Sequence, residues 1–120
     1  MGISFIKALL QNNISFKNIF ILEKYISKEL INIRKSKKII VKKNASLLPG
    51  KFRPDITLLA VKPDVLSRAM DENLINVISN SLIISIIAGK KSRELKKLTK
   101  NTNSTVRAMT NTPVSLGMGT

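Results

Sequence analysis

Two short apolar runs, residues 56–61 and 81–87, are the feature that most constrains the fold of this chain. Neither run alternates apolar with polar residues along its whole length. Such a continuous run is typical of a strand covered on both faces, as in a parallel sheet between layers of helices. Lys62 and Pro63 end the first run, and Ala88 and Gly89 end the second. We therefore expect two buried strands.

Helix-like and strand-like segments alternate in the first half of the chain. Apolar residues recur at helical spacing in residues 3–10, so the chain is expected to begin within a helix. Residues 18–22 and 39–41 are short apolar segments of the kind that form strands. Between them, one predicted helix face carries three apolar residues at i, i+4 and i+7: Ile26, Leu30 and Ile33. This alternation favours an α/β domain with a parallel sheet.

The second half continues the alternation after a break at residues 49–50, which are Pro and Gly. Residues 63–70 suit a short helix with its proline in the first turn. Ser92 is a suitable N-cap for a later helix, in which Leu95 and Leu98 form the apolar stripe. The same fold class therefore accounts for both halves.

The composition is that of one globular domain of 120 residues, 43% of them hydrophobic. No apolar run approaches the roughly 20 residues needed to cross a bilayer, and we expect no secretory signal, since residues 1–20 do not show a basic region followed by an uninterrupted apolar core. We therefore expect a cytoplasmic location and no membrane partner. The chain has neither cysteine nor histidine. This excludes disulfides, thiolate metal sites, imidazole bases and thiol nucleophiles, and no metal site is expected.

The net charge of +14 raises the question of nucleic-acid binding. Much of the charge lies in residues 34–43 and 90–100. Nucleic-acid-binding surfaces usually add stacking aromatic residues or a known module, and this chain has one Tyr, no Trp and no such motif. Lys, Ile and Asn are abundant together, as in an A/T-rich gene, and such lysines accumulate on solvated faces. We expect no nucleic-acid binding.

Polar residues, glycine or proline follow each of the last three predicted strands. The last strand is expected at residues 105–109, and Pro113 biases Thr112 away from helical angles, so the chain turns at Asn111 and Thr112. Ligands of open α/β sheets bind outside the carboxyl ends of the strands. A ligand-binding loop and an ordinary turn are both compatible with this pattern.

The two earlier strand ends carry residues suited to a ligand crevice. Gly89 would let the backbone approach a flat ring, Lys62 offers a cation, and Pro63 fixes the following turn. The alternatives are a solvated lysine at Lys62 and a helix start at Pro63.

The three strand ends carry motifs in a fixed order. Residues 60–63 read A-V-K-P, residues 85–89 read S-I-I-A-G, and residues 107–113 read R-A-M-T-N-T-P, followed by a glycine-rich segment at 117–120. Taken in this order, they resemble the N-terminal dinucleotide-binding domain of pyrroline-5-carboxylate reductase, whose patterns are A-V-K-P, S-x-A-A-G and R-x-M-[PT]-N-T-P. The resemblance covers nearly the whole chain and is strongest from Asp55 onward.

The resemblance implies a Rossmann-like, doubly wound, mostly parallel sheet that lacks its first strand. The family opens with a strand and G-x-G-N-M-[GA], which holds the cofactor pyrophosphate at a helix N-terminus. Met1 and Gly2 match only the last two positions of that motif. Residues 1–120 are thus expected to form an incomplete NAD(P)-binding domain, without the family's helical dimerisation domain, and to fold poorly in isolation.

The resemblance also implies a set of cofactor-binding residues. NADP is the expected cofactor and NAD the alternative, since Glu23 would favour a free ribose hydroxyl and Lys24 a phosphate. Asn44 matches the position of an adenosine-side asparagine. The complete expected set is Gly2, Glu23, Asn44, Ala60, Val61, Lys62, Pro63, Ala88, Gly89, Asn111 and Thr112.

The implied activity is that of an oxidoreductase of proline biosynthesis, which reduces 1-pyrroline-5-carboxylate to proline with NAD(P)H. Full-length members form homo-oligomers. We expect this fragment to be inactive alone, to bind the imino-acid substrate only with the missing domain supplied, and to carry no catalytic side chain of its own. The alternatives are a non-catalytic dinucleotide-binding remnant and a basic nucleic-acid-binding protein.

Overall fold

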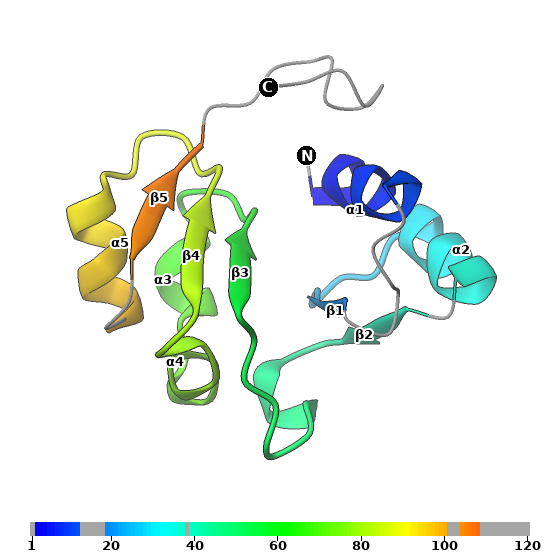
Figure 1. Ribbon diagram of the computed structural model, residues 1–120, viewed down its shortest axis with the longest axis horizontal. Helices are drawn as coiled ribbons and strands as arrows, with labels where there is room; N and C mark the ends of the chain where they lie inside the picture. Colours follow the sequence, from blue (N-terminus) through cyan, green and yellow to red (C-terminus); the bar gives the residue numbers. More distant parts are fainter. Residues whose placement is uncertain (1, 13–18, 38, 101–103, 109–120) are drawn as a thin grey trace. The chain divides into compact units, whose positions relative to one another are not determined.

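The computed structural model describes residues 2–12, 19–37, 39–100 and 104–108 (Figure 1). The described residues divide into two compact units. Unit 1 contains those up to Leu48, and unit 2 contains those from Pro49 on. Each unit has its own sheet and its own hydrophobic core, and each is described separately.

Unit 1 is a two-stranded parallel sheet with two helices. In chain order it consists of α1 (Gly2–Gln11), β1 (Phe20–Leu22), α2 (Lys28–Lys37), β2 (Ile40–Lys42) and the 3-10 helix η2 (Ala45–Leu47). Phe20 pairs with Ile40 and Leu22 with Lys42. The buried core contains one residue of α1, one of α2 and two at β2: Ile6, Leu30, Ile39 and Val41. The predicted helix–strand–helix–strand order is confirmed.

The start of α2 differs from the prediction. Ile26 was expected on the helix face, but the helix begins at Lys28. The Ser27 hydroxyl accepts a hydrogen bond from the Leu30 N–H at 3.2 Å, in the manner of an N-cap, so Ile26 lies before the helix. Its side chain still packs against the core of unit 1. The i, i+4, i+7 pattern therefore identified the core residues but began the helix too early.

Unit 2 is a three-stranded parallel sheet with three helices. In chain order it consists of β3 (Ile56–Leu59), α3 (Leu66–Ala69), α4 (Glu72–Ile78), β4 (Leu82–Ser85), α5 (Ser92–Thr99) and β5 (Thr105–Arg107). The strand order is β3-β4-β5, and both pairings are parallel. Parallel neighbours need helical crossovers, which α3, α4 and α5 supply. The predicted α/β fold with parallel strands is confirmed.

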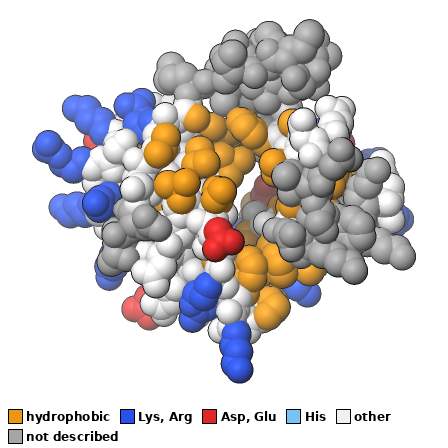
Figure 2. Space-filling view, viewed as in Figure 1, with side chains coloured by type: hydrophobic (Ala, Val, Ile, Leu, Met, Phe, Trp, Pro, Cys, Tyr) orange, Lys and Arg blue, Asp and Glu red, His pale blue; other side chains and the backbone are white. Residues whose placement is uncertain are grey.

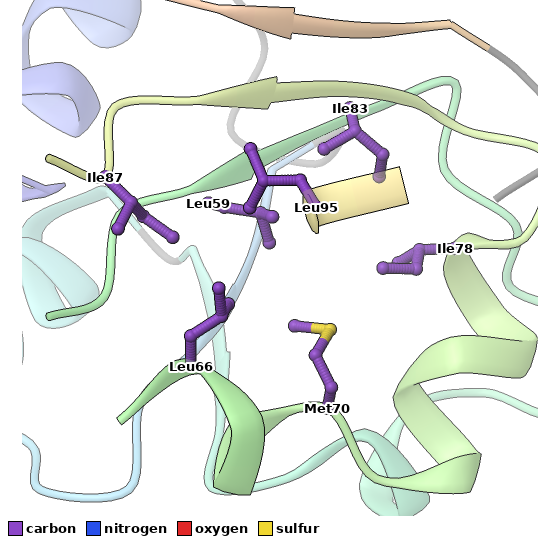
Figure 3. Close-up of a cluster of buried hydrophobic side chains, with 7 residues drawn as sticks. All are labelled: Leu59, Leu66, Met70, Ile78, Ile83, Ile87 and Leu95. Carbon is purple, nitrogen blue, oxygen red and sulfur yellow. The ribbon is translucent and has the colours of Figure 1, made fainter. Parts of the chain in front are cut away.

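The core of unit 2 lies between the sheet and its helices (Figure 3). Leu59 of β3 and Ile83 of β4 project into it from the sheet, together with Ile87 beyond β4. Three side chains come from helices, which are Leu66, Ile78 and Leu95, and Met70 follows directly after α3. All seven are at most 9% exposed, so this cluster fixes how the helices pack on the strands.

The two apolar runs that were expected to be buried alike are not. In β4, Ile83 and Ser85 are buried and their neighbours half-buried, as expected for a central strand. The prediction is wrong for β3, where Ile56 is 59% exposed and only Leu59 is buried. Within the described chain β3 is an edge strand, so its first residues have a neighbouring strand on one side only.

The helices of unit 2 also depart from three expectations. Pro63 is not in a helix, because α3 begins at Leu66. The unpredicted helix α4 is capped by Asp71, whose carboxylate accepts the Leu74 N–H at 2.8 Å. Ser92 is the first residue of α5 and not its cap, since the cap position holds Lys91 without a side-chain hydrogen bond. The apolar stripe of α5 is confirmed, with its first leucine fully buried.

None of the helices among the described residues has the length and apolar content needed to cross a membrane.

Candidate functional site

The carboxyl ends of the three strands of unit 2 lie at the same edge of its sheet. Leu59 pairs with Ser85, and Ser85 pairs with Arg107. The Ile86 N–H donates to the Leu59 carbonyl at 3.1 Å, and the Ala108 N–H donates to the Ser85 carbonyl at 2.8 Å. The pairing therefore extends to the last residue of each strand, and the segments that follow leave the sheet side by side.

Six of the predicted cofactor-binding residues lie in two of these segments. They are all exposed, and they are Ala60, Val61, Lys62, Pro63, Ala88 and Gly89. The Lys62 carbonyl accepts the Val65 N–H at 3.0 Å, which closes a turn directly after β3. The structure thus brings these six residues to the carboxyl edge, where open α/β sheets bind ligands.

Gly89 has a conformation that explains why this position holds a glycine. Its φ of +75° lies in the left-handed region, which other residues adopt at a cost. A Cβ built on Gly89 would meet no atom within 4 Å. The glycine is therefore required by the backbone turn, and the space beside it is open for a ligand.

Ser85 is a residue of this edge that sequence reasoning did not include in the site. Its side chain is 1% exposed, and its hydroxyl accepts the Ile87 N–H at 3.1 Å. This bond bends the chain immediately after β4 and so directs the segment that ends in Gly89. A serine within an isoleucine-rich run was a usable sign, because a buried hydroxyl in such a run needs a hydrogen-bond partner.

The segments at the carboxyl edge carry more positive than negative charge. Lys62, Lys91 and Arg107 are exposed and Lys90 is half-buried, while Asp64 is the one acidic residue of residues 60–64, 86–91 and 107–108. Cationic side chains at such an edge favour an anionic ligand.

The basic residues of α5 form a separate, outward face. Leu95 and Thr99 are buried, whereas Arg93, Lys96 and Lys97 are exposed. Lys and Arg side chains gather on the α5 side of unit 2 (left in Figure 2). This division agrees with the prediction that the lysines of residues 90–100 lie on a solvated helix face.

Three predicted residues lie in unit 1, two of them at the carboxyl edge of its own sheet. Glu23 directly follows β1, and its N–H donates to the Lys42 carbonyl of β2 at 3.0 Å. Asn44 follows β2, and its side-chain oxygen accepts the Ser46 N–H at 3.1 Å to cap η2. Gly2 is the first residue of α1. Both Glu23 and Asn44 are exposed.

Tyr25 is a second residue that sequence reasoning missed. Its ring is 79% exposed, and the Lys24 ammonium lies 5.6 Å from the ring centroid. Cation–π contacts at this distance are weakly attractive. The loop after β1 therefore presents a carboxylate, an ammonium and an aromatic ring to solvent in three consecutive residues. A lone tyrosine in the sequence was the only sign of this aromatic surface.

The predicted residues Asn111 and Thr112 lie outside the described residues. An open depression in unit 1 is lined by Lys7, Leu10, Gln11, Ile33 and Ser36, none of them a predicted site residue. Among the residues that the structure describes, no cluster of acidic side chains is arranged to hold a metal ion.

One of two comparisons of the sequence with known proteins finds a relative. No protein-family model matches the chain. Over 68 residues, which are 57% of this chain, it is 36% identical to a pyrroline-5-carboxylate reductase of Haemophilus influenzae. The match spans 25% of the length of that relative.

Solved structures extend the similarity to nearly the whole chain. A pyrroline-5-carboxylate reductase from Coxiella burnetii superposes with a TM-score of 0.82 and 23% identity, covering 98% of this chain and 43% of its own. At that identity the match establishes the fold alone. A Plasmodium falciparum pyrroline carboxylate reductase with NADP bound gives a TM-score of 0.76 at 25% identity. That match covers 99% of this chain and 42% of the Plasmodium chain. In sequence and in fold, the chain therefore corresponds to the N-terminal domain of pyrroline-5-carboxylate reductases.

Proposed function

We propose that this chain binds NADP(H) as the cofactor half of a pyrroline-5-carboxylate reductase and does not reduce the imino acid by itself. The observation that carries the proposal is the alignment of the segments after β3 and β4. The pairing of Leu59 with Ser85 brings residues 60–63 and 86–89 to one carboxyl edge. That edge is the cofactor site of doubly wound sheets.

The residues of this edge would bind and orient the cofactor. Gly89 leaves open space beside the backbone, so a flat ring can approach it closely. Lys62 is exposed and can neutralise an anionic group. The bound reduced cofactor supplies the hydride, and the contribution of this chain is to position that cofactor.

Turnover would require groups that the carboxyl edge does not offer. With no cysteine or histidine in the chain, the described edge presents cationic and apolar side chains and the carboxylate of Asp64. The resemblance places the dimer contacts and much of the imino-acid site in a helical domain outside the matched region. Without that domain we expect cofactor binding and no reduction.

The loop after β1 carries one residue that suits each cofactor, and the resemblance to the reductase family favours NADP over NAD. Lys24 is exposed and could pair with a 2′-phosphate, whereas Glu23 would repel one. Replacing the ammonium should weaken binding of NADPH more than binding of NADH. The change Lys24→Ala tests this, with Lys28→Ala as a control that removes an exposed lysine from the start of α2.

Binding is tested by titrating the full 120-residue chain with NADPH and following nucleotide fluorescence. The expected result is a saturable response that Lys62→Ala weakens by about threefold to tenfold, which is the range of about 0.5–1.5 kcal/mol for a single solvent-exposed contact. The matched control Lys51→Ala removes an exposed lysine ahead of the amino end of β3, so it should leave the affinity unchanged. No saturable response, or equal effects of the two changes, would contradict the proposed site.

The second half of the proposal is tested by adding 1-pyrroline-5-carboxylate to the NADPH-loaded chain. We expect no oxidation of NADPH above the rate without substrate. Reduction at a rate typical of an intact reductase would show that the chain is a complete enzyme. Saturable binding without turnover is also the behaviour of a non-catalytic remnant. The helical domain of a relative, supplied separately, distinguishes the two hypotheses. If it restores turnover, the chain is the cofactor-binding half of a reductase and not a non-catalytic remnant.

A further inference from the structure

Tyr25 is an aromatic residue of unit 1 that contributes nothing to a core. At 79% it has the largest exposed fraction among the large hydrophobic side chains in the described part of the chain. Tyrosine rings normally bury a large area when they stabilise a fold. The next residue, Ile26, packs against the buried cluster of unit 1 and takes that structural role in this loop. The flat face of the Tyr25 ring is therefore left for a ligand.

The loop that carries Tyr25 is held at both ends. Before the ring, the Glu23 N–H donates to the Lys42 carbonyl at 3.0 Å, which continues the pairing of β1 with β2 beyond Leu22. After the ring, Ile26 is fixed by its packing on the core. The short segment between these anchors presents the ring at a defined place beside the carboxyl edge of the unit 1 sheet.

The polar groups at this edge are those that bind a nucleoside. Asn44 follows β2, the strand that pairs with β1, so the two loops leave the same edge. The Asn44 side-chain oxygen accepts the Ser46 N–H at 3.1 Å and also accepts the Ser46 hydroxyl. Because the oxygen is bonded in this way, the amide presents its N–H groups, which can donate to the ring nitrogens of a purine. The exposed Glu23 carboxylate suits a ribose hydroxyl.

We propose that Tyr25 is the residue on which the adenine base of the cofactor stacks. The inference rests on the proposed binding of NADP(H) and adds a residue outside the expected cofactor-binding set. Nucleic-acid bases stack on exposed aromatic side chains because both groups are flat and apolar on their faces. The Lys24 ammonium lies 5.6 Å from the ring centroid, and the high exposure of the ring leaves space for a base.

The residues before Tyr25 favour adenine over nicotinamide as the stacked ring. A 2′-phosphate is carried on the adenosine ribose alone, and Lys24 offers an exposed ammonium directly beside the tyrosine. The proposed place of the nicotinamide is in unit 2, where Gly89 leaves open space beside the backbone. The two rings of the cofactor thus have different kinds of site, an aromatic platform for adenine and a glycine for nicotinamide.

The fluorescence of the protein provides a direct test. The chain has one tyrosine and no tryptophan, so tyrosine emission reports on Tyr25 alone. The full 120-residue chain is titrated with 2′,5′-ADP, which carries adenine and the 2′-phosphate and lacks nicotinamide. Stacking quenches tyrosine emission, so we expect a saturable decrease. Nicotinamide mononucleotide should cause none at the same concentrations. No saturable decrease with 2′,5′-ADP, or an equal one with both ligands, would overturn the proposal.

Variants of Tyr25 separate stacking from apolar contact. Calorimetric titration with 2′,5′-ADP should show that Tyr25→Ala weakens binding by about 5-fold to 150-fold, the range for loss of one base–aromatic stack. Tyr25→Phe keeps the ring and should keep most of the affinity, whereas Tyr25→Leu should resemble the alanine variant. Leu9→Ala is the control, because it removes another exposed apolar side chain of unit 1 and should leave binding unchanged. Equal affinity of the alanine variant and the unmodified chain, or equal losses in Phe and Ala, would contradict stacking.

The outcome for Tyr25 is distinguishable from the outcome for the proposed function. If NADPH binds saturably and Lys62→Ala weakens it while Tyr25→Ala does not, the stacking role is overturned and the cofactor site in unit 2 stands. If NADPH does not bind but 2′,5′-ADP quenches Tyr25, the proposed cofactor-binding half fails and the stacking residue is retained. Absence of binding by both ligands would overturn both proposals.

Discussion

The left-handed backbone at Gly89 makes a quantitative prediction for the change Gly89→Ala. An added Cβ meets no atom within 4 Å, so steric contact with neighbouring residues contributes nothing. The cost comes from φ alone, and at +75° an alanine loses about 1–2 kcal/mol relative to glycine. The restriction of the unfolded chain by alanine returns about 0.4–1 kcal/mol. We expect unit 2 to be destabilised by up to about 1.5 kcal/mol.

Gly50 is the control, because it is also an exposed glycine of unit 2 but lacks the left-handed backbone of Gly89. A Cβ at Gly50 also meets nothing within 4 Å, and its φ is not positive. Gly50→Ala should therefore stabilise the chain by about 0.4–1 kcal/mol through the unfolded state. The unfolded-state contribution cancels in the difference between the two variants, which should be about 1–2 kcal/mol. Gly89→Asn should fall between them, since asparagine tolerates the left-handed region better than alanine.

The assay is amide exchange at Ile83, a buried residue of the central strand, which reports on unit 2 separately from unit 1. A difference of 1–2 kcal/mol corresponds to roughly a 5- to 30-fold change in the open population. Equal exchange in the two alanine variants would refute the argument from φ. NADPH titration of the same proteins adds a second comparison, in which only Gly89→Ala should weaken binding.

Three further predictions concern stability, measured by urea unfolding followed by circular dichroism. Leu95→Ala removes a fully buried side chain from the core of unit 2 and should cost about 2–5 kcal/mol; a loss below about 1 kcal/mol would contradict its place in that core. Asp71→Ala removes the carboxylate that accepts the Leu74 N–H and should cost about 1 kcal/mol, most of it recovered in Asp71→Asn. Lys7→Ala breaks an ion pair with Glu29 in which both side chains are about half exposed, so it should lower the free energy of unfolding by less than about 1 kcal/mol. A larger loss would contradict the weak contribution expected of an exposed ion pair.

Elements that depend on local pattern could be predicted from the sequence. The helix at the start of the chain and the apolar stripe of α5 follow from the helical spacing of apolar residues, and the two strands of unit 1 follow from short apolar segments. The helix α4, which the sequence analysis does not include, has an equally local sign, namely the capping residue Asp71 followed by the apolar residues Leu74 and Ile78.

Properties that depend on neighbours do not follow from the composition of a segment. The runs that became β3 and β4 have similar composition, yet only β4 has a strand on each side. Composition shows that a segment can be buried, whereas strand order decides whether it is. For the same reason the role of Ser85 was missed: its partner is an N–H two residues on, available only once the chain bends after β4.

The register of the sheet in unit 2, and not any single motif, positions the candidate site. A slip of one residue between β3 and β4 would turn Leu59 out of the core and present its neighbour to Ile83. The buried cluster of Figure 3 opposes that slip, because seven side chains from the strands and helices pack together. The same register determines that residues 60–63 leave the sheet beside residues 86–89. Core residues that never touch a ligand therefore decide which residues meet at the carboxyl edge.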